Sequence, residues 1–237
     1  MTLLQVNELT ARHGLLEAVR GVSFDINEGE ILAIVGANGA GKSTMLRTIA
    51  GAHTAAAGRI SFEGNDITDL PAHERVRAGI ALVPEGRKLF GEMTVEENLL
   101  VAGRRARPGP WSLDTVLAAF PMLEDLRHRR AGALSGGQQQ ATSIARAMMT
   151  NPRLLLIDEV SLGLAPVAVD GVYESVKALH DQGTTVVIVE QDLGRALSTA
   201  DRVVCVLEGR IVLDAPTRAI TRDQVTDAYF GLGARTS

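Results

Sequence analysis

Glycine, lysine and serine residues stand at a spacing that suits the binding of phosphate groups. Residues 36–44 read Gly-Ala-Asn-Gly-Ala-Gly-Lys-Ser-Thr and match the pattern G-x-x-x-x-G-K-[ST]. Glycines let the backbone bend so that several N–H groups point into one hollow and hold phosphate oxygens. Lys42 can reach the β- and γ-phosphates, and the Ser43 hydroxyl can bind Mg²⁺. We therefore expect a nucleotide to contact Gly36, Asn38, Gly39, Ala40, Gly41, Lys42, Ser43 and Thr44.

The neighbouring elements decide between a phosphate loop and an ordinary glycine-rich turn. Residues 31–35 are all apolar and predict a strand, whereas residues 45–50 permit a helix. A phosphate loop requires a strand before it and a helix after it. This context favours the phosphate loop over the turn.

Two acidic residues follow another apolar strand, which we predict at 154–157. In a phosphate-loop NTPase, a carboxylate at the end of such a strand approaches Mg²⁺ and its water shell, and we expect Asp158 to do so. Glu159 comes one residue later and can orient and polarise the water that attacks the γ-phosphate. The alternative is a pair of acids that merely faces solvent. With Lys42 stabilising charge, Glu159 is our candidate catalytic residue.

A second device for binding phosphate precedes the helix predicted at 136–149. Ser135 can cap this helix, and Gly136 and Gly137 allow an oxyanion to approach its N-terminus closely. An ordinary serine-capped helix is the alternative. One nucleotide does not need two such devices from one chain.

Composition limits the class of protein. The chain has 237 residues, a formal net charge of −4 and one cysteine, Cys205, in an apolar run that favours a buried filler. The acidic balance argues against nucleic acid as a partner. No run approaches the ~18–20 apolar residues that span a bilayer, and the N-terminus lacks the features of a signal peptide.

The predicted elements indicate an α/β fold. Apolar strands joined by helices imply a mainly parallel sheet, and short strands at 3–9 and 19–26 add N-terminal antiparallel β structure. Strands are not predicted between about 86 and 150. We therefore divide the chain into a RecA-like α/β ATP-binding core at 1–85 and 151–237, and an inserted helical subdomain at 86–150.

The order of the motifs resembles that of ABC-transporter ATPases. Leu-Ser-Gly-Gly-Gln at 134–138 lies between the phosphate loop and Leu-Leu-Leu-Ile-Asp-Glu at 154–159, and the likeness covers essentially the whole chain. The resemblance implies a P-loop NTPase cassette that hydrolyses ATP with Mg²⁺. It also implies that two cassettes pair head to tail. The signature residues Ser135, Gly136, Gly137 and Gln138 would then bind the nucleotide across the interface.

Three positions depart from the general pattern of that family. Glu85 replaces a usual glutamine, and its carboxylate can accept hydrogen bonds and approach both nucleotide and Mg²⁺. Gln191 replaces a histidine that senses the γ-phosphate, and its amide can donate to phosphate without carrying charge. His13 replaces an aromatic residue that stacks on adenine; a plain loop histidine is an equal alternative. We interpret the other histidines as scattered surface residues: His53, His73, His128 and His180.

These departures occur together in one subgroup. The runs at 83–87, 93–99, 161–166 and 189–191 resemble the LivF-like ATPases of branched-chain amino-acid importers. The resemblance implies a peripheral subunit at the cytoplasmic face of the membrane. Its partners would be a second ABC ATPase (in a homodimer or heterodimer), two transmembrane permease subunits and, indirectly, an external substrate-binding protein. The alternatives are a urea or short-amide importer and a soluble ABC ATPase.

Overall fold

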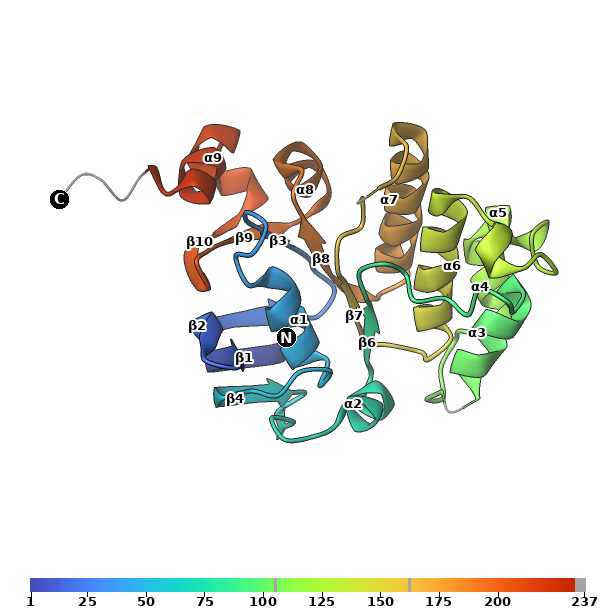
Figure 1. The fold of residues 1–237 in the computed structure, drawn as a ribbon, viewed down its shortest axis with the longest axis horizontal. Coiled ribbons are helices and arrows are strands. Elements are labelled where there is room, and N and C mark those ends of the chain that lie inside the picture. The colour runs from blue at the N-terminus through green and yellow to red at the C-terminus, as the bar shows by residue number, and fades with distance from the viewer. Residues whose placement is uncertain (105, 162, 233–237) are drawn as a thin grey trace. The chain divides into compact units, whose positions relative to one another are not determined.

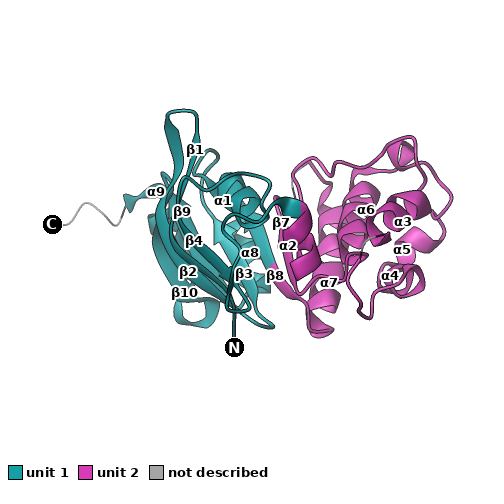
Figure 2. Cartoon of the chain, turned by 90° about the horizontal axis from the view of Figure 1, so that it is seen from below, with its two compact units in different colours: residues 1–72, 187–237 teal, residues 73–186 magenta. Residues whose placement is uncertain are grey.

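The computed structural model describes residues 1–104, 106–161 and 163–232 (Figure 1). The chain forms two compact units, coloured separately in Figure 2. Unit 1 contains residues 1–72 and 187–237, and unit 2 contains residues 73–186.

Unit 1 contains an antiparallel sheet near the N-terminus. Its strands are β1 (Thr2–His13), β2 (Leu16–Asn27), β4 (Ala57–Phe62) and β5 (Asn65–Asp66), in the order β2-β1-β4-β5. The hairpin between β1 and β2 turns at Gly14, whose φ of 61° is left-handed and suits glycine. The predicted strands at 3–9 and 19–26 are confirmed, although both strands are longer.

The other sheet of unit 1 carries the phosphate loop. Within unit 1, the strands of this sheet are β3 (Ile31–Val35), β8 (Thr185–Glu190, whose first two residues fall in unit 2), β9 (Arg202–Leu207) and β10 (Arg210–Pro216), in the order β10-β9-β3-β8. All of β3 and β8 is buried, as expected for strands covered on both faces. Strands β3 and β9 are parallel, whereas β10 runs antiparallel to β9 and was not predicted.

Helices α1 (Lys42–Ile49), α8 (Leu193–Thr199) and α9 (Arg222–Phe230) complete this unit. Helix α8 packs against β3 and α9 packs against β9. Arg202 of β9 links β10 and β2. It donates to both carboxylate oxygens of Asp214 at 2.6 Å and to the carbonyl of Asp25 at 3.0 Å. The hydrogen bond to Asp214 raises the pKa of Arg202 above its ordinary value.

Unit 2 contains the parallel strands β6 (Ile80–Val83) and β7 (Leu154–Ile157), which pair residue by residue from Ile80 with Leu154 to Val83 with Ile157. Its helices include α6 (Gly136–Met148) and α7 (Pro166–Asp181), which lie side by side (Figure 1). The shorter helices are α2 (Ala72–Ala78), α3 (Val95–Gly103), α4 (Leu113–Ala119) and α5 (Pro121–Glu124). Helix α2 begins one residue before this unit.

Side-chain caps explain where the helices of unit 2 begin. Thr94 accepts from the Glu97 N–H, and the Glu97 carboxylate accepts from the Thr94 N–H, which forms a capping box at the start of α3. Ser112 and Ser135 cap α4 and α6 in the same reciprocal way.

The regular elements described between residues 95 and 148 are all helical. A helical subdomain at 86–150, with a core at 1–85 and 151–237, stays a prediction because the compact units divide the chain at 72 and 186. Among the described residues, no helix combines the length and the apolar character needed to cross a membrane.

Candidate functional site

The phosphate loop of unit 1 has glycines where the packing leaves no space for a side chain. A Cβ on Gly36 would lie 2.2 Å from the carbonyl oxygen of Val206, and a Cβ on Gly41 would lie 2.1 Å from that of Ala18. Gly41 also has a φ of 103°, which other residues rarely adopt. Packing of the loop against β9 and β2 therefore requires glycine at both glycine positions of the pattern, Gly36 and Gly41.

Lys42 lies across its own loop. Its side chain is buried, and Nζ donates to the carbonyl oxygens of Gly36 at 2.7 Å and Ala37 at 3.0 Å. Helix α1 begins here with Gly41 as its N-cap, which supplies no capping side chain. The loop thus presents a buried ammonium group and an amide-rich helix start, as phosphate binding requires.

His13 lies beside the same helix start. Its Nε2 is 3.0 Å from Oγ1 of Thr44, so a side chain at the end of β1 reaches the predicted phosphate-binding residues. The ring of His53 lies 4.7 Å from the ring of His13 between centroids. Nε2 of His53 is also 3.1 Å from the carbonyl oxygen of Arg12. His53, interpreted as one of several scattered surface residues, is half-buried and packs against His13.

Gln191 follows β8, also in unit 1. Its N–H donates to the Glu190 carboxylate at 3.2 Å. Glu190 is buried, with 1% of its surface exposed. Glu190 was not predicted as a site residue, although the apolar run that ends in this acid could have indicated it.

Glu85 and Asp158 follow the two paired strands of unit 2. Val83 and Ile157 are partners at the ends of β6 and β7, and the Asp158 N–H donates to the Val83 carbonyl at 2.9 Å. Asp158 is buried, with 1% of its surface exposed, whereas Glu85 is exposed. Parallel strands that end together therefore bring the predicted Mg²⁺-binding carboxylates to the same edge.

Glu159 has a backbone conformation that acidic side chains seldom adopt. Its φ is 59°, in the left-handed region, where a residue with a Cβ is disfavoured by about 1–2 kcal/mol. Such strain is often found where a side chain must point in one direction for function. The side chain of Glu159 is half-buried next to the buried Asp158.

The signature residues form the start of α6 in unit 2. Ser135 accepts from the Gln138 N–H at 3.4 Å, and the Gln138 side chain accepts from the Ser135 N–H at 2.9 Å. The predicted serine cap is confirmed, and Gln138 serves the same helix start. Gly137 is buried, and a Cβ there would lie 2.6 Å from Cβ of Ala168 in α7.

The donor chemistry of these residues suits Mg²⁺ and a triphosphate. Mg²⁺ prefers oxygen ligands and keeps several waters, so the hydroxyl of Ser43 and the carboxylates of Asp158 and Glu85 match its preference. Lys42 and the start of α1 supply positive charge for phosphate oxygens.

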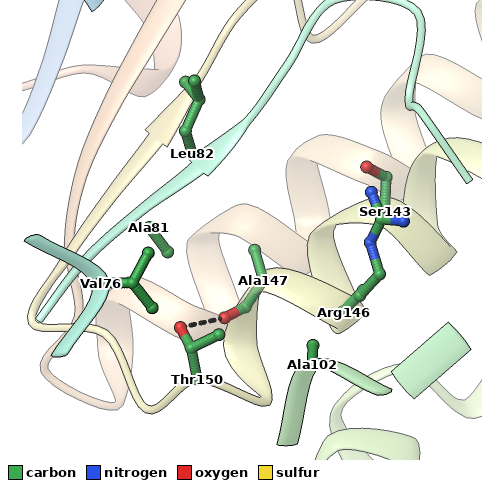
Figure 3. Close-up of a pocket in the computed structure, with 8 residues that line it drawn as sticks. All are labelled: Val76, Ala81, Leu82, Ala102, Ser143, Arg146, Ala147 and Thr150. Carbon is green, nitrogen blue, oxygen red and sulfur yellow. Dashed lines mark hydrogen bonds between the residues drawn. The ribbon is translucent and has the colours of Figure 1, made fainter. Parts of the chain in front are cut away.

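Unit 2 also contains a cavity of about 150 Å³ (Figure 3), which is lined by residues other than the signature residues. Its lining is mainly apolar, with Val76, Ala81 and Leu82 on one side. Arg146 contributes from α6, and burial lowers the pKa of its guanidinium below the ordinary value. Apolar side chains on the neighbouring loop and helix are exposed, namely Phe90, Leu100 and Val101.

Comparison with known proteins agrees with this geometry. A family model described as "ABC transporter" matches residues 19–161. The branched-chain amino acid transport ATP-binding protein BraG of Pseudomonas aeruginosa is 42% identical over 232 residues, which cover 97% of this chain and 100% of BraG. BraF of the same organism, with the same description, is 32% identical over 249 residues and covers 97% of this chain and 98% of BraF.

Solved structures show the same fold. A nucleotide-free ATP-binding cassette from an ABC transporter superposes with a TM-score of 0.81 and 31% identity, over 97% of this chain and 99% of the cassette. A dimeric cassette in a post-hydrolysis state, bound to ADP and Pi, also gives a TM-score of 0.81, with 26% identity over 92% of this chain and all of the cassette. The chain therefore belongs to the ABC transporter family, as one of its ATP-binding, ATP-hydrolysing cassettes.

Proposed function

We propose that this chain is the ATP-hydrolysing subunit that powers an importer of branched-chain amino acids. The observation that carries the ATPase assignment is the phosphate loop, where packing requires Gly36 and Gly41 and where Lys42 is buried over the loop carbonyls. The full-length similarity to BraG and BraF supports the cargo. A urea or short-amide importer is the alternative cargo assignment from the sequence.

The chemistry is in-line attack of water on the γ-phosphate of ATP. Lys42 and the start of α1 stabilise charge on the phosphates, and Ser43, Asp158 and Glu85 hold Mg²⁺ and its waters. Glu159 orients and polarises the water, and the strained backbone of Glu159 supports a directed role. Gln191 donates to the γ-phosphate, and His13 stacks on the adenine.

A second cassette completes the site. Ser135, Gly136 and Gly137 contact the nucleotide bound by the opposite cassette, with the amide groups at the start of α6 directed at the γ-phosphate. The dimeric relative with ADP and Pi supports pairing. Because BraG and BraF come from one organism and both resemble this chain, we favour a heterodimer with a sister ATPase.

The permease subunits bind unit 2. The cavity beside Arg146 and the exposed apolar residues Phe90, Leu100 and Val101 support a docking surface for a permease segment. The subunit is then held peripherally at the cytoplasmic face of the membrane through its partners. An external binding protein delivers the amino acid, and nucleic acid has no part.

Substitution of Lys42 tests this function. In the complex reconstituted in lipid vesicles, Lys42→Ala should lower phosphate release at this phosphate loop by at least about 100-fold, because charge on the γ-phosphate loses its main cationic partner. The measurement compares phosphate release and uptake of radiolabelled leucine in complexes whose other ATPase carries the equivalent substitution. Unchanged uptake in that doubly substituted complex would refute an ATP-driven role. Transport of urea but not of leucine by the unmodified complex would refute the cargo alone.

A further inference from the structure

Arg87 lies against the signature helix, although it belongs to the loop that follows Glu85. A Cβ on Gly136 would lie 3.3 Å from Nη2 of Arg87, so the guanidinium lies beside the first residue of α6. Nη1 donates to Oε1 of Gln139 at 3.1 Å. The side chain thus lies along the first turn of the helix that carries Ser135 and Gly137.

The main chain of Arg87 is fastened to the same helix. Oγ of Ser143 and Nη2 of Arg146 donate to the Arg87 carbonyl at 2.9 and 3.0 Å, and Nη1 of Arg146 donates to the Lys88 carbonyl at 2.8 Å. Both donors project from α6 at the cavity in Figure 3. Arg87 and Lys88 have φ values of 63° and 47°, so the loop is held in a left-handed turn. Arg87 is therefore fixed at both its backbone and its side chain.

The placement of this charge is unfavourable without a ligand. The N-terminus of a helix carries partial positive charge, and a cation there is destabilising, whereas an anion is stabilising by about 0.3–1 kcal/mol. The first turn of α6 contains no acidic residue. Among the residues that the structure describes, no carboxylate forms an ion pair with Arg87, and its Nε and Nη2 donate no hydrogen bond. An anion at this helix start would offset the repulsion between the guanidinium and the helix N-terminus. It would also accept hydrogen bonds from Nε and Nη2 of Arg87.

We propose that Arg87 is a further phosphate-binding residue, whose guanidinium contacts the γ-phosphate held by the opposite cassette. This inference rests on the proposed function, in which Ser135 and Gly137 face that nucleotide. Arginine carries a fixed positive charge and several donors, which suits the negative charge on the equatorial oxygens during transfer. Arg87 exchanges no proton. The attacking water forms the new O–P bond, and ADP leaves with the electrons of the broken bond.

The test places the substitution on one side of the dimer. In the two-cassette complex, Lys42→Ala disables the phosphate loop of this chain, so the remaining hydrolysis occurs at the other loop, which this chain's signature covers. In that background, Arg87→Met should lower kcat by at least about tenfold. In the opposite background, where the phosphate-loop lysine of the other cassette is replaced by alanine, Arg87→Met should change kcat by less than about twofold. Arg87→Lys should recover part of the loss because it keeps the charge.

A second measurement requires no turnover. A Lys42→Ala complex in which the other cassette's catalytic glutamate is replaced by glutamine binds ATP at the other loop without turning it over. In that complex, Arg87→Met should raise the ATP concentration for half-maximal closure of the cassettes by at least about tenfold, and should leave ADP binding unchanged. Arg130→Met is the matched control, since it removes one arginine charge at an exposed position of unit 2 that pairs with Glu92. Unfolding curves show whether Arg87→Met folds like the control.

The outcomes separate the two proposals. Ser135→Ala in the Lys42→Ala background reports whether the signature acts across the dimer at all. If Ser135→Ala lowers kcat and Arg87→Met does not, the role of Arg87 is refuted and the proposed function stands. Equal weakening of ATP and ADP binding also refutes it, since Arg87 would then only hold the loop. If neither substitution has an effect, the paired site itself is wrong.

Discussion

Lys42 carries a buried positive charge at the predicted phosphate loop. Its ammonium group is buried, and the carbonyl oxygens of Gly36 and Ala37 satisfy it. A buried ammonium without such partners would be costly. In the proposed function, Lys42 exchanges these two carbonyl oxygens for the charged oxygens of the triphosphate, which are stronger acceptors because they carry charge.

Cys205 illustrates a residue that burial makes inert. Its side chain is fully buried in β9, and burial raises the pKa of the thiol to about 11. We expect no reaction with Ellman's reagent at pH 8 in the folded protein, and one equivalent of reaction after unfolding in urea, because the thiolate is the reactive form. Since the folded pKa is the higher one, this thiol's contribution to stability is complete below the pKa of the unfolded chain and is lost as pH rises toward 11. Rapid labelling of the folded protein at pH 8 would contradict this.

The chemistry-bearing residues were predictable where their roles depend on local spacing. Gly36 to Thr44, Ser135 to Gly137, and Asp158 with Glu159 could be found because each group is contiguous and its neighbours indicate the element. The pairing of His13 with His53 was not predictable, because the two residues lie 40 positions apart and meet only through folding. The contact of Arg87 with Gly136 was hidden for the same reason.

Helix α6 packs against α7 closely enough to require a glycine. Gly137→Ala should destabilise the protein by about 1–3 kcal/mol, because the new Cβ would lie 2.6 Å from Cβ of Ala168 and neither atom can turn away. Urea unfolding measures the change.

The matched control is Gly171→Ala in the middle of α7, where a Cβ meets nothing within 4 Å and φ is not left-handed. This substitution should stabilise the protein by about 0.5–1 kcal/mol, because alanine favours the helix. A gain in stability for both variants would show that α6 and α7 can move apart.

The helices and strands were predictable to different degrees. Strands β3 and β7 were predicted at their observed bounds, because short apolar runs between turn residues indicate buried strands. Strand β10 and helix α9 were missed. The alternating half-buried and exposed residues of β10 give only a weak apolar signal, and the strand is defined by pairing with β9. Such an edge is decided by tertiary contacts rather than by local sequence.

In the proposed function, the subunit is held at the membrane by its permease partners. Leu100→Glu, at the exposed apolar face of unit 2, should reduce recovery of the cassette with its permease by at least about tenfold, because the carboxylate would be desolvated on docking. Affinity purification of the assembled complex measures this, and ATP binding by the isolated subunit should not change.

Met122→Glu, at an equally exposed position of α5, is the control and should assemble normally. Normal assembly of the Leu100→Glu complex would place the permease elsewhere on the subunit.

In the role proposed for Glu159, its left-handed backbone sets folding stability against catalysis at one position. Glycine and asparagine adopt that conformation more readily than glutamate does. A laboratory selection for thermal stability alone would therefore tend to replace Glu159. The selected variants would be more stable but would no longer hydrolyse ATP. Engineers who wish to strengthen this subunit must screen for turnover at the same time.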